Sequence, residues 1–340
     1  MMDVRGRFNT ALKDTVEEWK KKDTVKGVYV HGSYVKGIIS PNSDLDLCVI
    51  MEADEAPAQL LAKYKGVMID MTFFTPEDVQ DVVEGNTHDM VKIASVVGQL
   101  RNAEVLYDKE GKLKSWQKDV STYQWPKESI QTAKTEAIEA LQSASAFAAE
   151  EDIISAVYEI REGLFELGRA VLMKNNNFCV IKPAEILTEI RMMDPMTYQL
   201  FLRTFKLKGL GENELLDMLE DIKAWIKKAE ELFDAESSDI AATIILSDAQ
   251  RSTFSAINLT LNGDYELAVF ELRLAIRKLG QALLAISGET TFNARTFISD
   301  IKEHEPNFYN NILVKYGAYE FHPKGVKRSI GEAEFIAKRI

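Results

Sequence analysis

Hydrophobic positions follow two different periods along the chain, and the period changes near residue 120. In the first part, short apolar runs of strand length cover residues 27–31, 45–51, 67–74 and 104–108. Between and around them, the pattern of apolar positions predicts helices over residues 7–22, 57–64, 76–83 and 87–100. For residues 1–120 we therefore predict a small mixed sheet with helices packed on it.

The second part of the chain has helical periodicity throughout. From residue 125 onward Pro and Gly become scarce, so everything after about residue 127 is expected to be helical. The segment AVYEIR at 156–161 recurs as AVFELR at 268–273, and Asp152 and Asp264 keep the same offset of 112 residues. Solenoid repeats are shorter than this. The pattern predicts an α+β protein in which two copies of a helical bundle, over 121–235 and 236–340, follow the sheet.

Composition and charge narrow the classes of function. No uncharged run approaches the roughly 18 residues that span a bilayer, so we expect a cytoplasmic protein without membrane contact. The net charge is −12, with an acidic excess in both parts of the chain. Lys and Arg supply most of the affinity for phosphate backbones, so nucleic acid is disfavoured as a partner, although a local basic patch is compatible with this charge. The two cysteines predict neither a disulfide framework nor a zinc site, and Cys48 is expected to be buried.

Three aspartates occur in apolar strand-like runs. Asp44 and Asp46 lie two residues apart at the start of one predicted strand, so their side chains should share one face of the sheet. Two neighbouring carboxylates repel each other unless a cation lies between them, and Mg²⁺ is commonly held by carboxylates together with substrate phosphates. Asp70 lies inside the next apolar strand, where the same face would explain an otherwise costly charge. We predict that all three bind Mg²⁺ and act in catalysis, with Asp70 as a candidate base.

A glycine-serine turn precedes the carboxylates. Gly32 and Ser33 follow a predicted strand, and such a turn allows the backbone to approach a phosphate closely. Lys36, on the following turn, can either contact a phosphate or be solvated. Phosphoryl transfer requires mainly these parts: metal ions on the phosphates, an in-line nucleophile and a proton acceptor.

Gly32-Ser33, a gap of ten residues and then Asp44-Leu45-Asp46-Leu47 resembles the signature of the polymerase-β-like nucleotidyltransferase superfamily. The likeness covers roughly residues 5–120 and is greatest to minimal nucleotidyltransferases and aminoglycoside adenylyltransferases, which carry a similar Ser-Asp pair, here Ser43-Asp44. The resemblance implies Mg²⁺ and a nucleoside triphosphate, ATP in first place, as cofactor and substrate. It also implies transfer of NMP to an acceptor hydroxyl, on a small molecule or a protein given the acidic charge.

The helical repeats resemble the HEPN-like or C-terminal helical domains that accompany such enzymes. Neither repeat has the Arg and closely following His of HEPN ribonucleases, so a packing or substrate-binding role is favoured. An alternative function is a non-catalytic nucleotide-binding module of a toxin-antitoxin-like system that acts through its helices. A homodimer is compatible with either function.

Several residues admit two interpretations. The Asp44 and Asp46 pair can also be a solvated acidic turn, and His31 is more typical of a core or rim position than of a catalytic one. Lys92 and Arg101 can neutralise a triphosphate or be surface charges. Glu159, Arg161 and Glu166 can line an acceptor site, but the recurrence of Glu159 and Arg161 at 271 and 273 favours a structural ion pair.

Overall fold

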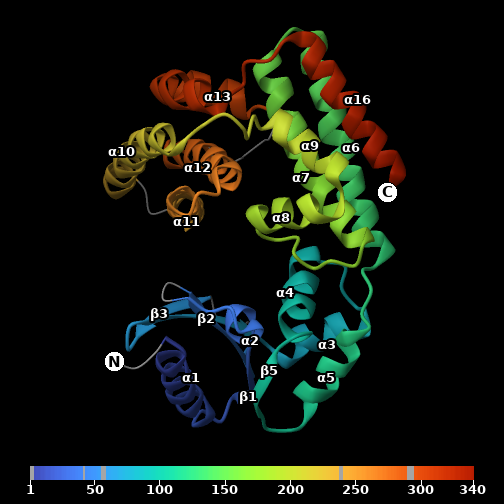
Figure 1. Ribbon diagram of the computed structural model, residues 1–340, viewed down its shortest axis with the longest axis vertical. Coiled ribbons are helices and arrows are strands. Elements are labelled where there is room, and N and C mark those ends of the chain that lie inside the picture. The colour runs from blue at the N-terminus through green and yellow to red at the C-terminus, as the bar shows by residue number, and fades with distance from the viewer. Residues whose placement is uncertain (1–3, 41–42, 55–58, 237–239, 289–294) are drawn as a thin grey trace. The chain divides into compact units, whose positions relative to one another are not determined.

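The computed structural model of the protein describes residues 4–40, 43–54, 59–236, 240–288 and 295–340. The chain forms two compact units. The sheet unit comprises Met1–Ser129 together with Asn176–Ile181, and the helical unit comprises Ile130–Asn175 together with Lys182–Ile340. Both are visible in Figure 1, the first in blue to green and the second in green to red.

The sheet unit alternates strands and helices. Its elements are α1 (Val4–Lys20), β1 (Val25–Val30), α2 (Gly32–Lys36), β2 (Asp44–Met51), β3 (Leu60–Tyr64), β4 (Val67–Phe74), α3 (Pro76–Glu84), α4 (Met90–Leu100), β5 (Glu104–Asp108) and α5 (Lys112–Ser121). The predicted mixed sheet with helices is confirmed, and so are most of the element positions. Helix α5 was not predicted from the sequence and is an additional element.

The five strands form one sheet in the order β3-β4-β2-β1-β5. The β2 and β4 strands are parallel and the other neighbouring pairs are antiparallel. Helix α1 covers one face (Figure 1), where its Phe8 and Leu12 pack against Leu45, Leu47 and Ile69. The apolar core on this face leaves the alternate residues of β2 and β4 on the opposite face.

The helix predicted over 57–64 is wrong for the part that the structure describes. Residues 60–64 form β3, which pairs antiparallel with β4. The two strands are joined by Lys65 and Gly66, both with positive φ angles of 49° and 79°. A two-residue connection of this kind matches the twist of antiparallel strands. The chain therefore turns back as a hairpin, and the start of the predicted helix lies outside the described residues.

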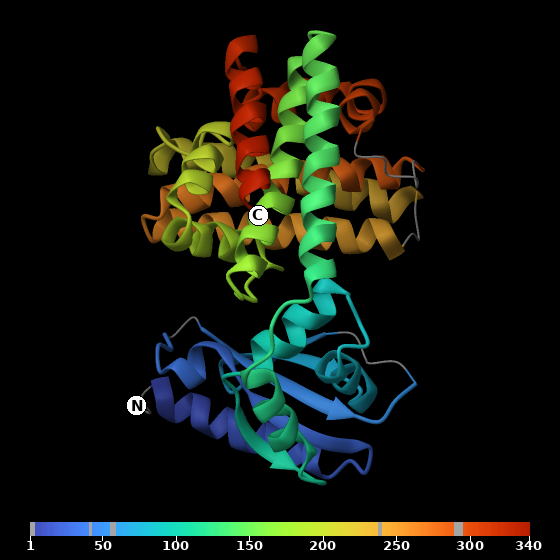
Figure 2. The ribbon, with the colours of Figure 1, turned by 90° about the vertical axis from the view of Figure 1, so that its right-hand side faces the viewer.

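In its described residues, the helical unit is built from α-helices and one π-helical segment. Its elements are α6 (Lys127–Ala149), α7 (Ile153–Lys174), α8 (Pro183–Met193), α9 (Pro195–Thr204), α10 (Glu212–Glu236), α11 (Ile240–Leu261), α12 (Tyr265–Ile286), α13 (Phe297–His304), α14 (Pro306–Phe308), η1 (Tyr309–Val314), α15 (Lys315–Gly317) and α16 (Pro323–Arg339). Helix α16 packs along α7, as Figure 2 shows. Within the described ranges, no helix combines the length and the apolar character needed to cross a bilayer.

The 112-residue offset of the sequence recurs in the backbone of the chain. Asp152 caps the start of α7 and Asp264 caps the start of α12, each with its side chain accepting a backbone N–H three residues on. Residues with left-handed backbone keep the same spacing in three pairs: Glu151 and Gly263, Asn176 and Gly288, and Lys206 and Ala318. Left-handed backbone is uncommon away from glycine, so three matched pairs indicate the same chain path at both positions.

Charged side chains lie inside the helical unit, on α7 and α12. Glu159, Arg161, Glu271 and Arg273 are each at most 7% exposed. Arg161 was expected to form an ion pair with a glutamate of its own repeat. Its guanidinium instead donates to backbone carbonyls. Burial raises the pKa of Glu159 to about 7, and burial likewise raises the pKa of Glu166 to about 7.

These two carboxyls predict the pH dependence of the helical unit. Their pKa rises from the ordinary 4.5 in the unfolded chain to about 7 in the folded one, so folding takes up protons between these values. The stability they contribute is complete below pH 4.5 and is lost as the pH rises through 7, by as much as about 3 kcal/mol for each group. Urea unfolding at pH 5.5 and pH 8 measures this. Glu159→Gln/Glu166→Gln should flatten the dependence, and an equally steep profile in that variant would contradict the assignment.

Candidate active site

The carboxylate face of the sheet is set by the register of β2 and β4. Asp46 is paired with Asp70 and Asp44 with Met68 in this parallel ladder. Paired residues share a face, so the three aspartates point to the side opposite α1. Leu45 and Leu47 between them are fully buried on the α1 side. Asp44 is exposed while Asp46 and Asp70 are half-buried, which places all three carboxylates within reach of solvent.

The glycine-serine turn lies directly against Asp46. The His31 N–H donates to the Asp46 carbonyl at 3.0 Å, and α2 begins at the next residue. Gly32 has a φ of +71°, and a Cβ placed there would lie 2.0 Å from Asp46 Oδ2. The position therefore requires glycine twice, for its backbone conformation and for the space that the carboxylate occupies.

Gly32→Ala should displace the Asp46 carboxylate and abolish nucleotide binding. Gly37→Ala is a matched control, because Gly37 has a φ of +72° but open space around it. The left-handed backbone lowers the free energy of unfolding of both variants by about 1–2 kcal/mol, and only Gly32→Ala moves the carboxylate. Thermal unfolding with and without Mg²⁺ and ATP compares them. Equal nucleotide responses in the two variants would show that the contact with Asp46 is unimportant.

Below the carboxylates, the same face carries a buried polar row. Cys48 is paired with both Tyr29 and Thr72, and the Thr72 hydroxyl donates to Gln99 Oε1 at 3.0 Å. Burial raises the pKa of the Cys48 thiol to about 12, so it stays protonated. Cys48 is fully buried, as expected. These residues lie next to Asp46 and Asp70 along the strands, on the same face, and the protonated thiol is not reactive.

The carboxylates fit Mg²⁺ by their chemistry and by strand register. In the described ranges, no three His, Cys, Asp or Glu side chains are grouped closely enough to hold a metal ion as they stand. Gln59 Nε2 donates to Asp70 Oδ1 at 2.5 Å and so holds one oxygen of that carboxylate. Hard carboxylate oxygens are nevertheless the donors that Mg²⁺ prefers, and Gly32 leaves the edge of Asp46 unobstructed.

The other predicted binding residues lie near the turn or in the loop that follows it. Ser33 is half-buried in α2, and Lys36 at the end of this helix is exposed. The Ser43 hydroxyl accepts the Ser40 N–H at 2.8 Å, which gives Ser43 a role in shaping the loop before Asp44. The His31 and Tyr29 rings lie with their centroids 6.0 Å apart and are tilted by 51° to each other.

The sequence did not indicate Lys63, because its strand was expected to be helical. Lys63 pairs with Met68 and Met68 pairs with Asp44, so the exposed lysine lies on the carboxylate face. The turn at Lys65 and Gly66 was the available signal, since glycine between two strand-like runs is typical of a hairpin. The structure thus adds a cation to a face on which sequence analysis had placed only acids.

Lys92 and Arg101 have structural partners. Lys92 Nζ lies 2.7 Å from Asp78 Oδ1. Arg101 donates to the carbonyls of Val120 and Tyr123 and lies over the Phe178 ring. Both cations therefore stabilise the sheet unit.

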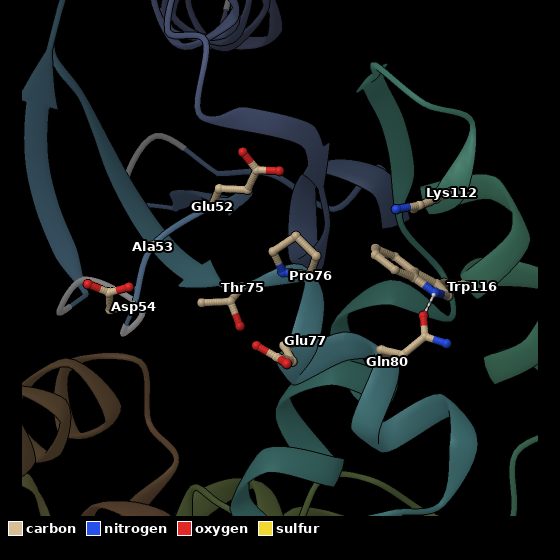
Figure 3. A pocket seen from close by; sticks show the side chains of 9 residues that line it. All are labelled: Glu52, Ala53, Asp54, Thr75, Pro76, Glu77, Gln80, Lys112 and Trp116. Atoms are coloured by element: carbon tan, nitrogen blue, oxygen red, sulfur yellow. Dashed lines mark hydrogen bonds between the residues drawn. The ribbon is translucent and has the colours of Figure 1, made fainter.

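A separate cavity of about 650 Å³ occurs at the far end of the parallel pair (Figure 3). It is lined by Glu52, Ala53, Asp54, Thr75, Pro76, Glu77, Gln80, Lys112 and Trp116. Several of these follow the last residues of β2 and β4, whereas Asp44 and Asp46 lie where β2 begins. Trp116 is held there by donating to Gln80 Oε1 at 3.2 Å. The cavity includes none of the predicted site residues.

Part of the chain matches a known protein family. Residues 12–144 match the nucleotidyltransferase domain family. A nucleotidyltransferase-like protein from Exiguobacterium sibiricum has a similar structure, with 11% sequence identity, a TM-score of 0.39 and coverage of 91% of each chain. No curated protein matches the sequence. The residues that match the family include Asp44, Asp46 and Asp70.

Proposed function

We propose that this protein is a Mg²⁺-dependent nucleotidyltransferase that moves NMP, AMP from ATP in the first instance, to an acceptor hydroxyl. The observation that carries the proposal is the pairing of Asp46 with Asp70 on adjacent parallel strands, beside the Gly32 turn. The family match over residues 12–144 supports the same class of reaction. The net charge of −12 favours a cationic small molecule or a protein as the acceptor over nucleic acid.

Asp44, Asp46 and Asp70 are the residues that would hold Mg²⁺. When bound there, Mg²⁺ would neutralise and orient the phosphates of the triphosphate. Asp70 would also accept the proton of the acceptor hydroxyl, a role that its half-buried carboxylate on the same face supports. The Gly32-Ser33 turn offers backbone N–H groups and a hydroxyl to a phosphate, and Lys36 and Lys63 supply positive charge.

A two-part experiment tests this function. Thermal unfolding is measured with each NTP, with and without Mg²⁺, and transfer from α-labelled NTP is then followed with cell extract as the source of acceptor. An NTP at about 100 times its dissociation constant stabilises the protein by roughly 2.7 kcal/mol. Stabilisation together with labelled product supports the enzyme. Stabilisation without product supports the regulatory alternative, and no response to any NTP contradicts both.

Lys63→Met should weaken NTP binding about tenfold, because a charge-assisted contact to phosphate is worth roughly 1.5–3 kcal/mol. Lys118→Met is a suitable control, since Lys118 is an exposed lysine on α5. The apparent affinity from the Mg²⁺-ATP titration compares the two. Equal affinities would remove Lys63 from the site.

We propose, further, that residues 1–120 are the nucleotidyltransferase domain and that 121–235 and 236–340 are two copies of one HEPN-like helical domain. The matched caps at Asp152 and Asp264 and the three matched pairs of left-handed residues support the duplication. Independent chain paths would have no reason to repeat such positions at one offset.

A further inference from the structure

Arg161 on α7 and Arg273 on α12 occupy equivalent positions, 112 residues apart, in the helical unit. The rings of Phe165 and Phe270 stack with centroids 5.5 Å apart, and the Arg277 guanidinium lies 5.8 Å from the Tyr158 ring. Adding or subtracting 112 converts one of these contacts into the other, so an approximate two-fold axis relates the two helices. Equivalent residues near such an axis face each other.

Arg161 is fully provided with partners. Its Nε donates to the Thr204 carbonyl at 3.1 Å, Nη1 to Gly317 at 2.7 Å and Nη2 to Ala318 at 3.0 Å. Its guanidinium also lies 4.5 Å from the centre of the Tyr319 ring. This arginine therefore fastens the two chain segments that contain the left-handed residues Lys206 and Ala318.

Arg273 lacks the corresponding bonds. Its side chain is only 7% exposed, and within the described part of the chain its Nε and Nη1 are enclosed without a hydrogen-bond partner. Burial and the neighbouring Arg161 both lower the pKa of Arg273. The two-fold arrangement thus brings two guanidinium groups together. Arg161 has hydrogen-bond partners for its nitrogens, whereas Nε and Nη1 of Arg273 have none among the described residues.

Further positive charge surrounds this arginine. Burial lowers the pKa of Lys206, and the charges of Arg273 and Arg161 lower it further. The Lys206 ammonium donates to the Glu320 carbonyl, and the exposed Glu320 carboxylate acts against these effects. The acid nearest to Arg273 in sequence, Glu271, is buried, and burial raises the pKa of its carboxyl while a hydrogen bond with Ser252 opposes that rise. Glu162, beside Arg161 in the sequence, lies 2.6 Å from Arg277. Arg273 itself has no carboxylate partner among the described ion pairs.

A buried charge without a partner is strongly unfavourable, and buried polar groups without hydrogen bonds call for an explanation, commonly an ion. The planar guanidinium matches phosphate and carboxylate geometry. We infer that Arg273, with the charges of Arg161 and Lys206 beside it, forms an oxyanion-binding site for a phosphate group. This site is built from the helical unit alone and does not depend on the proposed transfer reaction.

The test uses the full chain carrying Asp46→Asn, which weakens the contribution of the carboxylate face to any nucleotide response. Inorganic phosphate is titrated against sodium chloride at equal ionic strength, and thermal unfolding is recorded. The midpoint should rise by about 5 °C at saturation. ATP and AMP in place of phosphate distinguish a free ion from the phosphate of a nucleotide as the source.

The phosphate response of Arg273→Met is compared with that of Lys223→Met. Lys223 is exposed on α10, so its variant controls for the loss of one positive charge. Because the arginine lacks a partner, Arg273→Met should be at least as stable as the parent in phosphate-free buffer and should lose the phosphate response. Lys223→Met should keep that response. A phosphate response that survives Arg273→Met overturns the inference, as does equal stabilisation by chloride or a loss of stability in phosphate-free buffer.

Discussion

Asp46→Asn is expected to reduce NMP transfer by about a thousandfold or more while the protein remains folded. Asp46 faces Asp70 across the parallel ladder, and asparagine keeps its shape while removing one charge from the pair. Loss of a single preorganised charge contact costs about 10²–10³ in rate. Removal of a group that acts as part of a catalytic unit costs more. The rate of product formation from α-labelled NTP, at saturating Mg²⁺, measures the effect.

The unfolding midpoint in the absence of Mg²⁺ provides the second readout. Like charges opposite each other on neighbouring strands are destabilising, so Asp46→Asn should leave this midpoint unchanged or raise it. Asp119→Asn, an exposed acid on α5, should change neither rate nor midpoint. A variant that loses activity only by unfolding would argue for a structural Asp46, and one with full activity would exclude this face as the catalytic site.

The carboxylate face could be predicted from the sequence because its signals are local. A two-residue spacing on a strand fixes which face Asp44 and Asp46 share, and apolar neighbours fix which face is buried. The register that brings Asp70 beside Asp46 is a tertiary property, but parallel pairing of two buried strands leaves few alternatives. The glycine at residue 32 was expected for its backbone, whereas its contact with the Asp46 carboxylate became visible only in the structure.

The hairpin of β3 was missed because its residues have no clear strand pattern. Leu60 and Leu61 are both exposed at the edge of the sheet, so the alternation that identifies a half-buried strand is absent. Lys63 lies on this strand and was therefore missed as a site residue. In the helical unit, periodicity predicted helices, but the unequal surroundings of Arg161 and Arg273 could not follow from two nearly identical sequences. Which guanidinium finds carbonyl partners depends on loops that lie far away along the chain.

A single substitution with a large expected effect on stability lies in the helical unit, at the ion pair of Glu162 on α7 with Arg277 on α12. The Arg277 Nη2 lies 2.6 Å from Glu162 Oε2, with the two side chains 27% and 21% exposed. Burial raises the pKa of Glu162, and the charge of Arg277 opposes that rise. Arg277→Met leaves the carboxylate without its cation. Breaking such a pair costs about 3–5 kcal/mol when it is fully buried, so we expect a loss of about 3 kcal/mol, measured by urea unfolding.

The matched control is Arg328→Met, which breaks a pair of similar length, 2.8 Å to Glu332, in which the arginine is 75% exposed. Exposed pairs contribute about 0–1 kcal/mol, so this variant should be nearly neutral. Glu162→Leu/Arg277→Met removes both charges and should recover most of the loss, because the penalty arises from one uncompensated charge. If the two substitutions instead add, the contact between α7 and α12 depends on packing around Tyr158 and Arg277, and the ion pair is incidental to it.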